Sequence, residues 1–473
     1  MFDPQFYDPS LAVTVDPTTG LILGTPTLQQ LYNGMVIPGS GFPSDAKNHI
    51  PEANTNQWNF LFRGVPDHYS DIQWNDIQPR LGAAYQLNNK TVLRAGAGRF
   101  YTRLGVSDSI FLGGNPPFQP MASLTNGSVD ALGSSSASAI PLVVTTQSKD
   151  FQNPEAWNWN ASVQRELPWD LIANIAYVGR RGLHLQREAN INQPTTATIA
   201  ANPTVKNIDA LRPYKGFGSI RETDNVANSK YNSLQANLSR RFTNGLMFGV
   251  SYTLSKSMDN GSNQRDVVPD TYNTSMMWGP SEFDTRHILM INYLYELPFF
   301  RSQSNLIGKV LGGWQLSGIT QFQSGTPCSA AQNKDYAGVG LDANFGCGVN
   351  GQYWAWDGKL STPHTFGTTG QWICCASDFT QPAAGTFVTQ QVRDIIYQPG
   401  FQNWNMGLFK KFAVNERVNF QFRAEAFNVW NHPNWGGTSG GGLSLDPSNP
   451  KTFGTVSTKG SERNLQLSLR AEF

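Results

Sequence analysis

Apolar and polar residues alternate with a period of two in many segments of this chain. A clear example is the C-terminal segment "RNLQLSLRAEF", from Arg463 to Phe473, where apolar side chains share one face and polar side chains share the other. A period of two is typical of a β-strand with one buried face. The pattern alone leaves open whether a protein core or lipid covers that face.

The same alternation predicts about eleven strands of roughly ten to fourteen residues each. Besides the C-terminal strand, the predicted strands lie near residues 77–87, 90–102, 157–164, 170–181, 233–239, 246–255, 286–297, 312–324, 402–412 and 418–425.

The connections between these strands alternate between short and long. The short ones are turns at 88–89, 168–170, 243–245 and 413–416, with a medium link at 298–311. Connections longer than about 15 residues are uncommon in compact soluble domains. Short turns on one side and long loops on the other are typical of outer-membrane barrels. The long polar connections are 103–155, 182–229, 258–285, 325–400 and 431–462.

Composition favours lipid over a protein core. Charged residues make up only 15% of the chain, whereas soluble domains carry about 25%. The polar faces carry mainly Asn, Gln, Ser, Thr and Gly, which suits a wet lumen. We therefore expect an all-β fold, an antiparallel transmembrane β-barrel, with an aromatic girdle at the membrane interfaces. The girdle candidates are Trp157, Trp159, Tyr177, Tyr252, Trp314, Trp404, Phe412 and Phe473.

Net charge and hydropathy argue against a nucleic-acid partner, a transmembrane helix and an N-terminal signal peptide. A formal net charge of +1 gives no electrostatic attraction for nucleic acid. No run of about 18 apolar residues occurs, so no transmembrane helix is expected. The first residues, "MFDPQFYDPS", have neither a basic nor an apolar region, so no signal peptide is expected there.

The motifs that could carry catalysis or bind metal have simpler interpretations. The six histidines are scattered, and "FDTRH" (Asp284, Arg286 and His287) lies where a long loop re-enters a strand. The glycines of "GAGRF" at 96–100 lie within a strand, unlike those of a phosphate loop. We therefore expect no enzyme activity, no catalytic residue, no metal site and no cofactor.

The long connection 325–400 holds the candidate site residues. Its four cysteines, Cys328, Cys347, Cys374 and Cys375, lack the spacing of a zinc site, which leaves disulfides or free thiols. Because a bridge between adjacent cysteines is strained, we favour a disulfide from Cys328 or Cys347 to Cys374 or Cys375. The candidate ligand contacts are aromatic residues, with packing of the loop on itself as the alternative: Tyr353, Trp354, Trp356 and Trp372.

Taken in order, six segments resemble the C-terminal part of a TonB-dependent outer-membrane receptor of the Oar-like kind. The resemblance covers about residues 70–473. The segments are "QPRLGAAYQLNNKTVLRAGAGRFY" (78–101), "AWNWNASVQRELPWDLIANIAYVGRRGLHL" (156–185), "YNSLQANLSRRFTNGLMFGVSYTLSKSMD" (231–259), "FDTRHILMINYLYELPF" (283–299), "GGWQLSGITQFQSGTP" (312–327) and "VNFQFRAEAFNVWNHPNWG" (418–436).

The resemblance implies a position within a larger protein. Family barrels have 22 strands, so this chain is expected to supply the C-terminal half, with residues 76–473 in the barrel and residues 1–75 forming an irregular extracellular loop. No signal peptide or plug is recognised in this sequence. Phe473 looks like the terminal signal that the barrel assembly machinery recognises.

The implied function is uptake of a large solute across the outer membrane of a Gram-negative cell. The resemblance gives lipid, the assembly machinery and an unknown solute as partners, and the TonB energy-coupling system would act only through the plug. Two alternatives stay open at this point: a surface adhesion or structural protein, and a soluble β-rich carbohydrate-binding protein.

Overall fold

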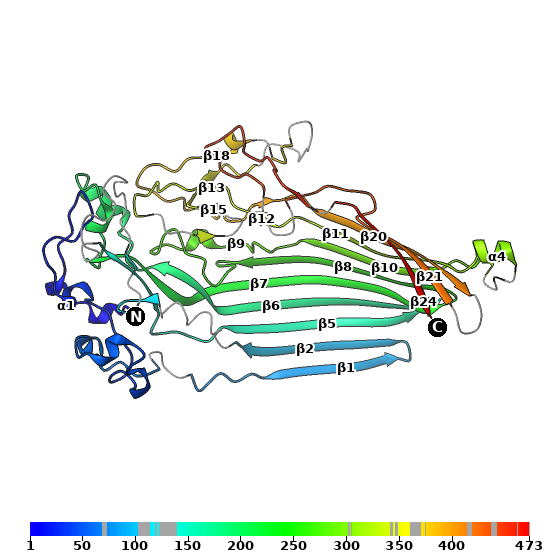
Figure 1. Cartoon of the computed structure of the whole chain (residues 1–473), viewed down its shortest axis with the longest axis horizontal. Helices are drawn as coiled ribbons and strands as arrows, with labels where there is room; N and C mark the ends of the chain where they lie inside the picture. Colours follow the sequence, from blue (N-terminus) through cyan, green and yellow to red (C-terminus); the bar gives the residue numbers. More distant parts are fainter. Residues whose placement is uncertain are drawn as a thin grey trace.

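The computed structural model is dominated by one large antiparallel sheet (Figure 1). It describes residues 1–68, 73–102, 114–118, 121–122, 140–300, 303, 305–340, 344–345, 349–359, 370–373, 375–413, 419–436, 442–460 and 462–472. Every neighbouring pair along the main path of the sheet is antiparallel, which confirms the all-β antiparallel fold predicted from the alternation.

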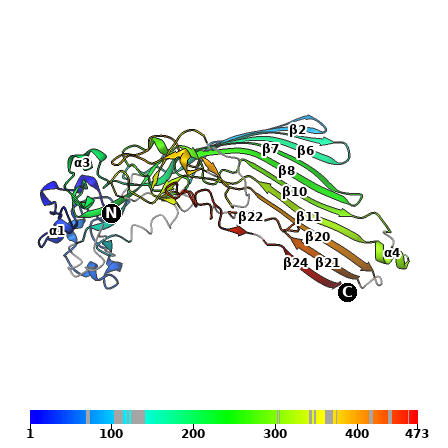
Figure 2. The same cartoon turned by 90° about the horizontal axis from the view of Figure 1, so that it is seen from above.

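Eleven strands make up this path within the described residues, and Figure 2 shows them as a single twisted layer. In order across the sheet they are β1 (Arg80–Asn88), β2 (Thr91–Tyr101), β5 (Glu155–Leu167), β6 (Leu171–Asn190), β7 (Phe217–Thr243), β8 (Leu246–Asp259), β10 (His287–Glu296), β11 (Trp314–Gln323), β20 (Phe401–Ala413), β21 (Asn419–Phe427) and β24 (Asn464–Glu472).

Local sequence sets the short turns at one end of the sheet. The turn from β7 to β8 consists of Asn244 and Gly245, with φ of 53° and 85°. Two residues with positive φ form the turn that matches the twist of an antiparallel hairpin, and Asn-Gly is the pair that adopts it most readily. Trp169 and Asp170 between β5 and β6 also have positive φ, at 64° and 60°.

One face of the sheet is apolar from edge to edge. The registers place the apolar residues of each strand opposite those of the next, and the asparagines, glutamines and serines meet on the other face. The alternation seen in the sequence therefore becomes two continuous surfaces. Apolar pairs along the path include Tyr85–Leu93, Leu93–Val163, Val163–Ile175, Tyr177–Leu234, Leu234–Leu254, Val250–Ile291, Tyr295–Leu316, Leu316–Leu408, Leu408–Ala424 and Ala424–Leu467.

Two strands are longer than the sequence predicted. β6 has 20 residues and β7 has 27. The prediction of a polar connection at 182–229 is therefore wrong at both of its ends, where the strands continue. Charged side chains occupy this part of the ladder, where the guanidinium of Arg221 in β7 lies 3.9 Å from the Glu188 carboxylate in β6, so the segment lacks the apolar alternation of the rest.

The outer ends of these strands carry the N-terminal region. Residues 1–68 are mostly irregular, with short helices of three or four residues, and they pack on β4 (Leu142–Gln147), which pairs in parallel with β7. Phe2 is fully buried there between the rings of Tyr214 and Phe217. The shared core consists of Phe2, Tyr32, Met35, Trp58, Leu61, Leu142, Val144, Phe217 and Ile220.

The remaining elements are short. The helices are η1 (Pro4–Phe6), η2 (Pro9–Leu11), α1 (Leu28–Leu31), η3 (Ser44–Ala46), η4 (Pro51–Asn54), η5 (Asn59–Leu61), α3 (Thr196–Ala201), η9 (Ile208–Ala210), η10 (Ser275–Met277), α4 (Leu306–Leu311) and η11 (Ala376–Asp378). None of the helices in the described part of the chain has the length and apolar character needed to cross a bilayer.

The short strands belong mostly to the long connections. They are β3 (Met121–Ala122), β9 (Gly279–Pro280), β12 (Pro327–Cys328), β13 (Ala331–Gln332), β14 (Asn344–Phe345), β15 (Val349–Asn350), β16 (Gln352–Tyr353), β17 (Ala355–Trp356), β18 (Phe379–Thr380), β19 (Ile396–Tyr397), β22 (Asn434–Trp435) and β23 (Lys459–Gly460). Of these, β9, β13, β15 and β18 lie, with the N-terminal region, in the part of the molecule away from the C-terminus and α4 (Figure 1).

A charge introduced at the same depth is expected to lower stability more on the apolar face of the sheet than on the polar face. We expect Val250→Arg, on the apolar face of β8, to destabilise the folded protein in lipid by about 2–4 kcal/mol, the typical effect of arginine at the bilayer midplane. Ser251→Arg, one residue further on the polar face, is the control and is expected to change stability by less than about 1 kcal/mol. Urea unfolding of both variants in phospholipid vesicles measures the difference. Equal destabilisation would contradict the assignment of the two faces.

Candidate functional site

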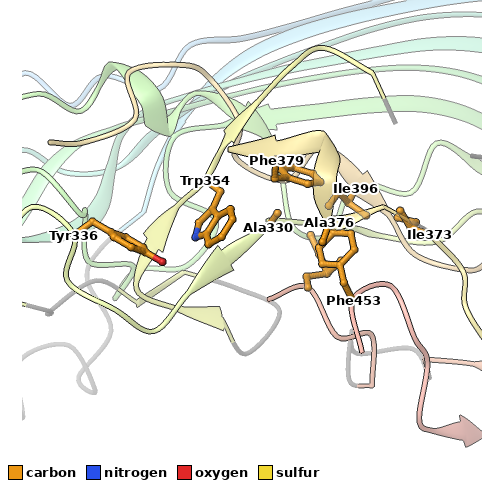
Figure 3. Close-up of a cluster of buried hydrophobic side chains, with 10 residues drawn as sticks. Ala330, Tyr336, Trp354, Ile373, Ala376, Phe379, Ile396 and Phe453 are labelled. Carbon is orange, nitrogen blue, oxygen red and sulfur yellow. The ribbon is translucent and has the colours of Figure 1, made fainter. Parts of the chain in front are cut away.

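The long connections 325–400 and 431–462 share one hydrophobic core (Figure 3). Leu445 and Phe453 of the second connection pack against side chains of the first. Because burial of apolar surface stabilises folded structure, this core holds the described parts of the two connections together outside the sheet. The cluster consists of Cys328, Ala330, Tyr336, Trp354, Ile373, Ala376, Phe379, Ile396, Leu445 and Phe453.

The four aromatic residues proposed as ligand contacts lie in or against two hydrophobic cores, the cluster described above and a second one around Met276 and Met277. Tyr353 is 2% exposed and packs with methionines of the 258–285 connection, and Trp354 is 8% exposed, edge-on to Tyr336. Trp356 and Trp372 are half-buried. Burial leaves the rings of Tyr353 and Trp354 no free face for a solute, so the packing alternative describes them better. A ligand role stays a prediction for Trp356 and Trp372.

The cysteines also stabilise this region. Cys328 and Cys375 are both in disulfides, and no free cysteine occurs among the described residues. Cys347 and Cys374 lie outside the described residues, as does Phe473, the predicted assembly signal. The last described residue of β24, Glu472, pairs with Asn419.

A buried charge cluster joins this loop region to the end of β8. Arg393 is 1% exposed, and its guanidinium donates to an Asp259 carboxylate oxygen at 2.7 Å and to the Ser262 hydroxyl at 2.6 Å. It also donates to the backbone carbonyl of Asp259 at 3.0 Å. Burial disfavours the charge on Arg393, but the carboxylates of Asp394 and Asp259 outweigh burial and raise its pKa. Removal of one partner from a buried ion pair of this kind is strongly destabilising, because the remaining charge is buried without compensation.

Asp394 is the titratable group of this cluster. Burial raises the pKa of its carboxyl to about 7, and Arg393 and the hydrogen bond from Ser329 offset only part of that rise. Its backbone has a φ of 55°, in the left-handed region that aspartate tolerates better than most residues. The side chain therefore changes charge in the physiological range.

The "FDTRH" motif is a structural contact at the rim of the sheet. Asp284 is buried and accepts hydrogen bonds from Lys256 at 2.9 Å, from the Tyr397 hydroxyl at 2.7 Å and from the backbone N–H of Ser257 at 2.6 Å. Burial raises the pKa of Tyr397, and the bond to Asp284 raises it further. The motif thus links the loop region to β8 a second time.

Two cavities lie on the sheet near its loop-bearing end. One, of about 490 Å³, lies over β5 to β8 and is lined by Arg180, Tyr231 and Phe283 among polar residues. The other, of about 340 Å³, is lined by His287 and His432, which the sequence had shown as separate. No group of three or more His, Cys, Asp or Glu that could hold a metal ion is found in the part of the chain that the structure describes.

The raised pKa of Asp394 predicts that the stability of the loop around this residue depends on pH. The unfolded chain releases this proton near the ordinary value of 3.8, whereas the folded protein keeps it up to about 7. The stability that Asp394 contributes is therefore fully present at low pH and falls as the pH rises between those values, by at most about 1.4 kcal/mol per pH unit for one proton.

Hydrogen exchange of residues 393–397 at pH 5, 6 and 7 measures this effect, after correction for the intrinsic pH dependence of exchange. We expect the free energy of local opening to decrease with pH in the native protein and to be flat in Asp394→Asn, which retains the contact with Ser329. A slope that persists in Asp394→Asn would assign the effect to other carboxyls, such as Asp266, whose pKa burial also raises.

Comparisons with known proteins come from sequence and from structure. No curated protein matches the chain by sequence. Among solved structures, it is similar to the outer membrane transporter YddB from Escherichia coli (12% identity, TM-score 0.45), with 84% of this chain and 40% of that one covered. It is also similar to the FrpB iron transporter from Neisseria meningitidis (F3-3 variant), with 12% identity, a TM-score of 0.41, and 84% of this chain and 39% of that one covered.

A third similar structure is the ferric enterobactin receptor mutant R480A (PfeA) from Pseudomonas aeruginosa in complex with enterobactin, with 11% identity, a TM-score of 0.40, and 84% and 40% coverage. The chain thus spans about two fifths of the length of these proteins. By sequence, it matches the outer membrane beta barrel domain family over residues 2–466. The chain therefore belongs to the family of outer-membrane β-barrel domains, and its sheet lies in the outer membrane.

Proposed function

We propose that this chain is part of an Oar-like, TonB-dependent transporter barrel that takes up a large solute. The observation that carries the proposal is the direction of the two edge strands. Neighbours on the path are antiparallel throughout, so the first and the eleventh strand, β1 and β24, run in the same direction. Direct closure between them would be a parallel seam, whereas bacterial outer-membrane barrels have an even number of antiparallel strands.

The edges need further strands because lipid offers the backbone no hydrogen-bond partners. In the described residues, no strand pairs with the outer edge of β1 or of β24. Each backbone group without a partner in hydrocarbon costs several kcal/mol. An odd number of additional strands restores antiparallel pairing at both seams. The resulting barrel exceeds eleven strands, and barrels of 16 to 22 strands enclose channels or plugged lumens.

The polar face supports uptake rather than a filled interior. It presents asparagines, serines and arginines along the strands, and the 490 Å³ cavity opens among such residues near the loops. A cavity whose lining combines aromatic rings, such as those of Tyr231 and Phe283, with polar side chains and the charge of Arg180 suits a chelated or other partly apolar solute. TonB coupling would act through a plug segment, and the assembly machinery would recognise the terminal strand that ends in Phe473.

A second candidate function is adhesion or a structural role at the cell surface. The observation that favours it is the large folded region outside the sheet, with hydrophobic cores of its own under residues 1–68 and 325–400. A soluble carbohydrate-binding protein is no longer a candidate, because the chain belongs to an outer-membrane family.

Energy-dependent uptake by cells that carry the complete gene tests the proposal. We expect deletion of the gene to abolish saturable uptake of one solute in a panel of metal chelates, oligosaccharides and peptides. A protonophore is expected to abolish the same uptake in undeleted cells, because TonB coupling uses the proton-motive force. Deletion that weakens surface attachment while leaving uptake of every solute in the panel unchanged would support adhesion instead.

A pair of arginine variants tests the cavity. Arg180→Ala removes a charge that lines it, and we expect uptake to fall several-fold with an unchanged amount of folded barrel in the membrane. Arg94→Ala is the matched control, because Arg94 points to the same face but lies near the short turn between β1 and β2. Equal effects of the two variants would contradict a role for the cavity.

A further inference from the structure

The connection between β10 and β11 exposes a cluster of large apolar side chains at the end of the sheet that bears the short turns. It contains the helix α4, which projects beyond the strand ends in Figures 1 and 2. Exposed clusters of this kind mark contacts with membranes or proteins. The exposed fractions are 62% for Phe299, 50% for Phe300, 81% for Leu306, 60% for Ile307, 60% for Val310 and 52% for Leu311.

The apolar residues of α4 share one side of the helix. With 3.6 residues per turn, Leu306 and Val310 form one row and Ile307 and Leu311 the adjacent row, so together they span roughly 140°. Gly308 lies on the protein side, buried against Gln303 and Asn305. A six-residue helix is too short to be stable alone in water. Its apolar rows therefore need an apolar environment that the described residues do not supply.

Hydrogen bonds attach this segment to the apolar face of the sheet. The Trp314 indole N–H donates to the carbonyl of Val310 at 3.0 Å, and the Lys410 ammonium donates to the carbonyl of Gly312, just past the helix. Trp314 and Lys410 are registered opposite each other on the apolar face. The Lys410 ammonium lies 5.4 Å from the Trp314 ring centroid. The exposed apolar side of α4 is thus attached at the rim of the surface that faces lipid.

The position and charge of the segment identify its partner. Short turns of bacterial outer-membrane barrels face the periplasm, so α4 lies at the level of the periplasmic leaflet. Trp314 at the start of β11 is an interfacial aromatic. Lys309 is exposed and lies roughly opposite Ile307 around the helix axis. It carries a positive charge suited to a lipid phosphate.

We propose that α4 is an interfacial anchor, whose residues Leu306, Ile307, Val310 and Leu311 insert into the periplasmic leaflet of the outer membrane and bind its phospholipids. Amphipathic helices of this kind lie in the plane of the membrane, with the apolar side at the boundary of headgroups and acyl chains. The anchor fixes the depth of the adjacent strands β10 and β11, because α4 connects them directly.

Site-specific fluorescence on the full-length protein in vesicles of phosphatidylethanolamine and phosphatidylglycerol tests this proposal. An environment-sensitive nitrobenzoxadiazole label is attached, without reduction of the native disulfides, to Ile307→Cys or to the control Lys309→Cys on the other side of the helix. Val310→Cys, on the apolar side, repeats the measurement should Ile307→Cys assemble poorly. The quenchers are aqueous iodide and a phospholipid with a nitroxide near the top of its acyl chain.

We expect the nitroxide lipid to quench the label at 307 by about twofold and iodide to have little effect, because the label lies below the headgroups. At 309, which the proposal places at the level of the lipid phosphates and above the acyl chains, we expect strong quenching by iodide and weaker quenching by the nitroxide lipid than at 307. Strong iodide quenching at 307 would place the helix in water and overturn the proposal. Protection of 307 from both quenchers would mean that protein covers it, either a second copy or another segment, and would overturn the lipid assignment equally.

Discussion

In the hydrocarbon of a membrane, a backbone N–H or C=O has no partner except another backbone or side-chain group of the protein. Most of this structure depends on that constraint. It requires long antiparallel ladders with tight turns such as Asn244-Gly245 between them, and it is the reason for which we propose further strands along β1 and β24. Many large side chains of the apolar face, such as Leu81, Ile175 and Leu467, are exposed, as expected for a sheet that lies in the outer membrane.

The membrane part of the fold could be predicted because its determinants are local. The alternation of apolar and polar residues in β8, β11 or β24 is visible within ten residues and requires no knowledge of the neighbouring strand. Turn residues are equally local. The outer parts of β6 and β7 escaped prediction because neither of their faces is uniformly apolar, and charged pairs such as Arg221–Glu188 replace the alternation.

The region outside the membrane could not be predicted because its determinants are distant in the sequence. Arg393 and Asp259 are 134 positions apart, and neither has a local pattern that marks it as buried. Phe2 likewise packs against Phe217. Aromatic residues in a polar loop, such as Tyr353 and Trp354, suggested ligand contacts, but their exposure depends on which other segment folds over them. A sequence shows that such residues are apolar and does not show what covers them.

The backbone pairing of the sheet and the side-chain contacts of the loop region meet at the outer end of β8. From Leu246 to Asp259, this strand runs from the Asn-Gly turn to the charge cluster, and Asp259, Ser257 and Lys256 hold the loop region through Arg393, Asp284 and Tyr397. β7 pairs with β8 as far as Asp259 and β10 pairs with it as far as Leu254, so the loop contacts are attached to a strand that the sheet holds in place. Loss of the Arg393 contacts would therefore weaken the attachment of the loop region to β8 without breaking the backbone pairing of β8 with β7 and β10.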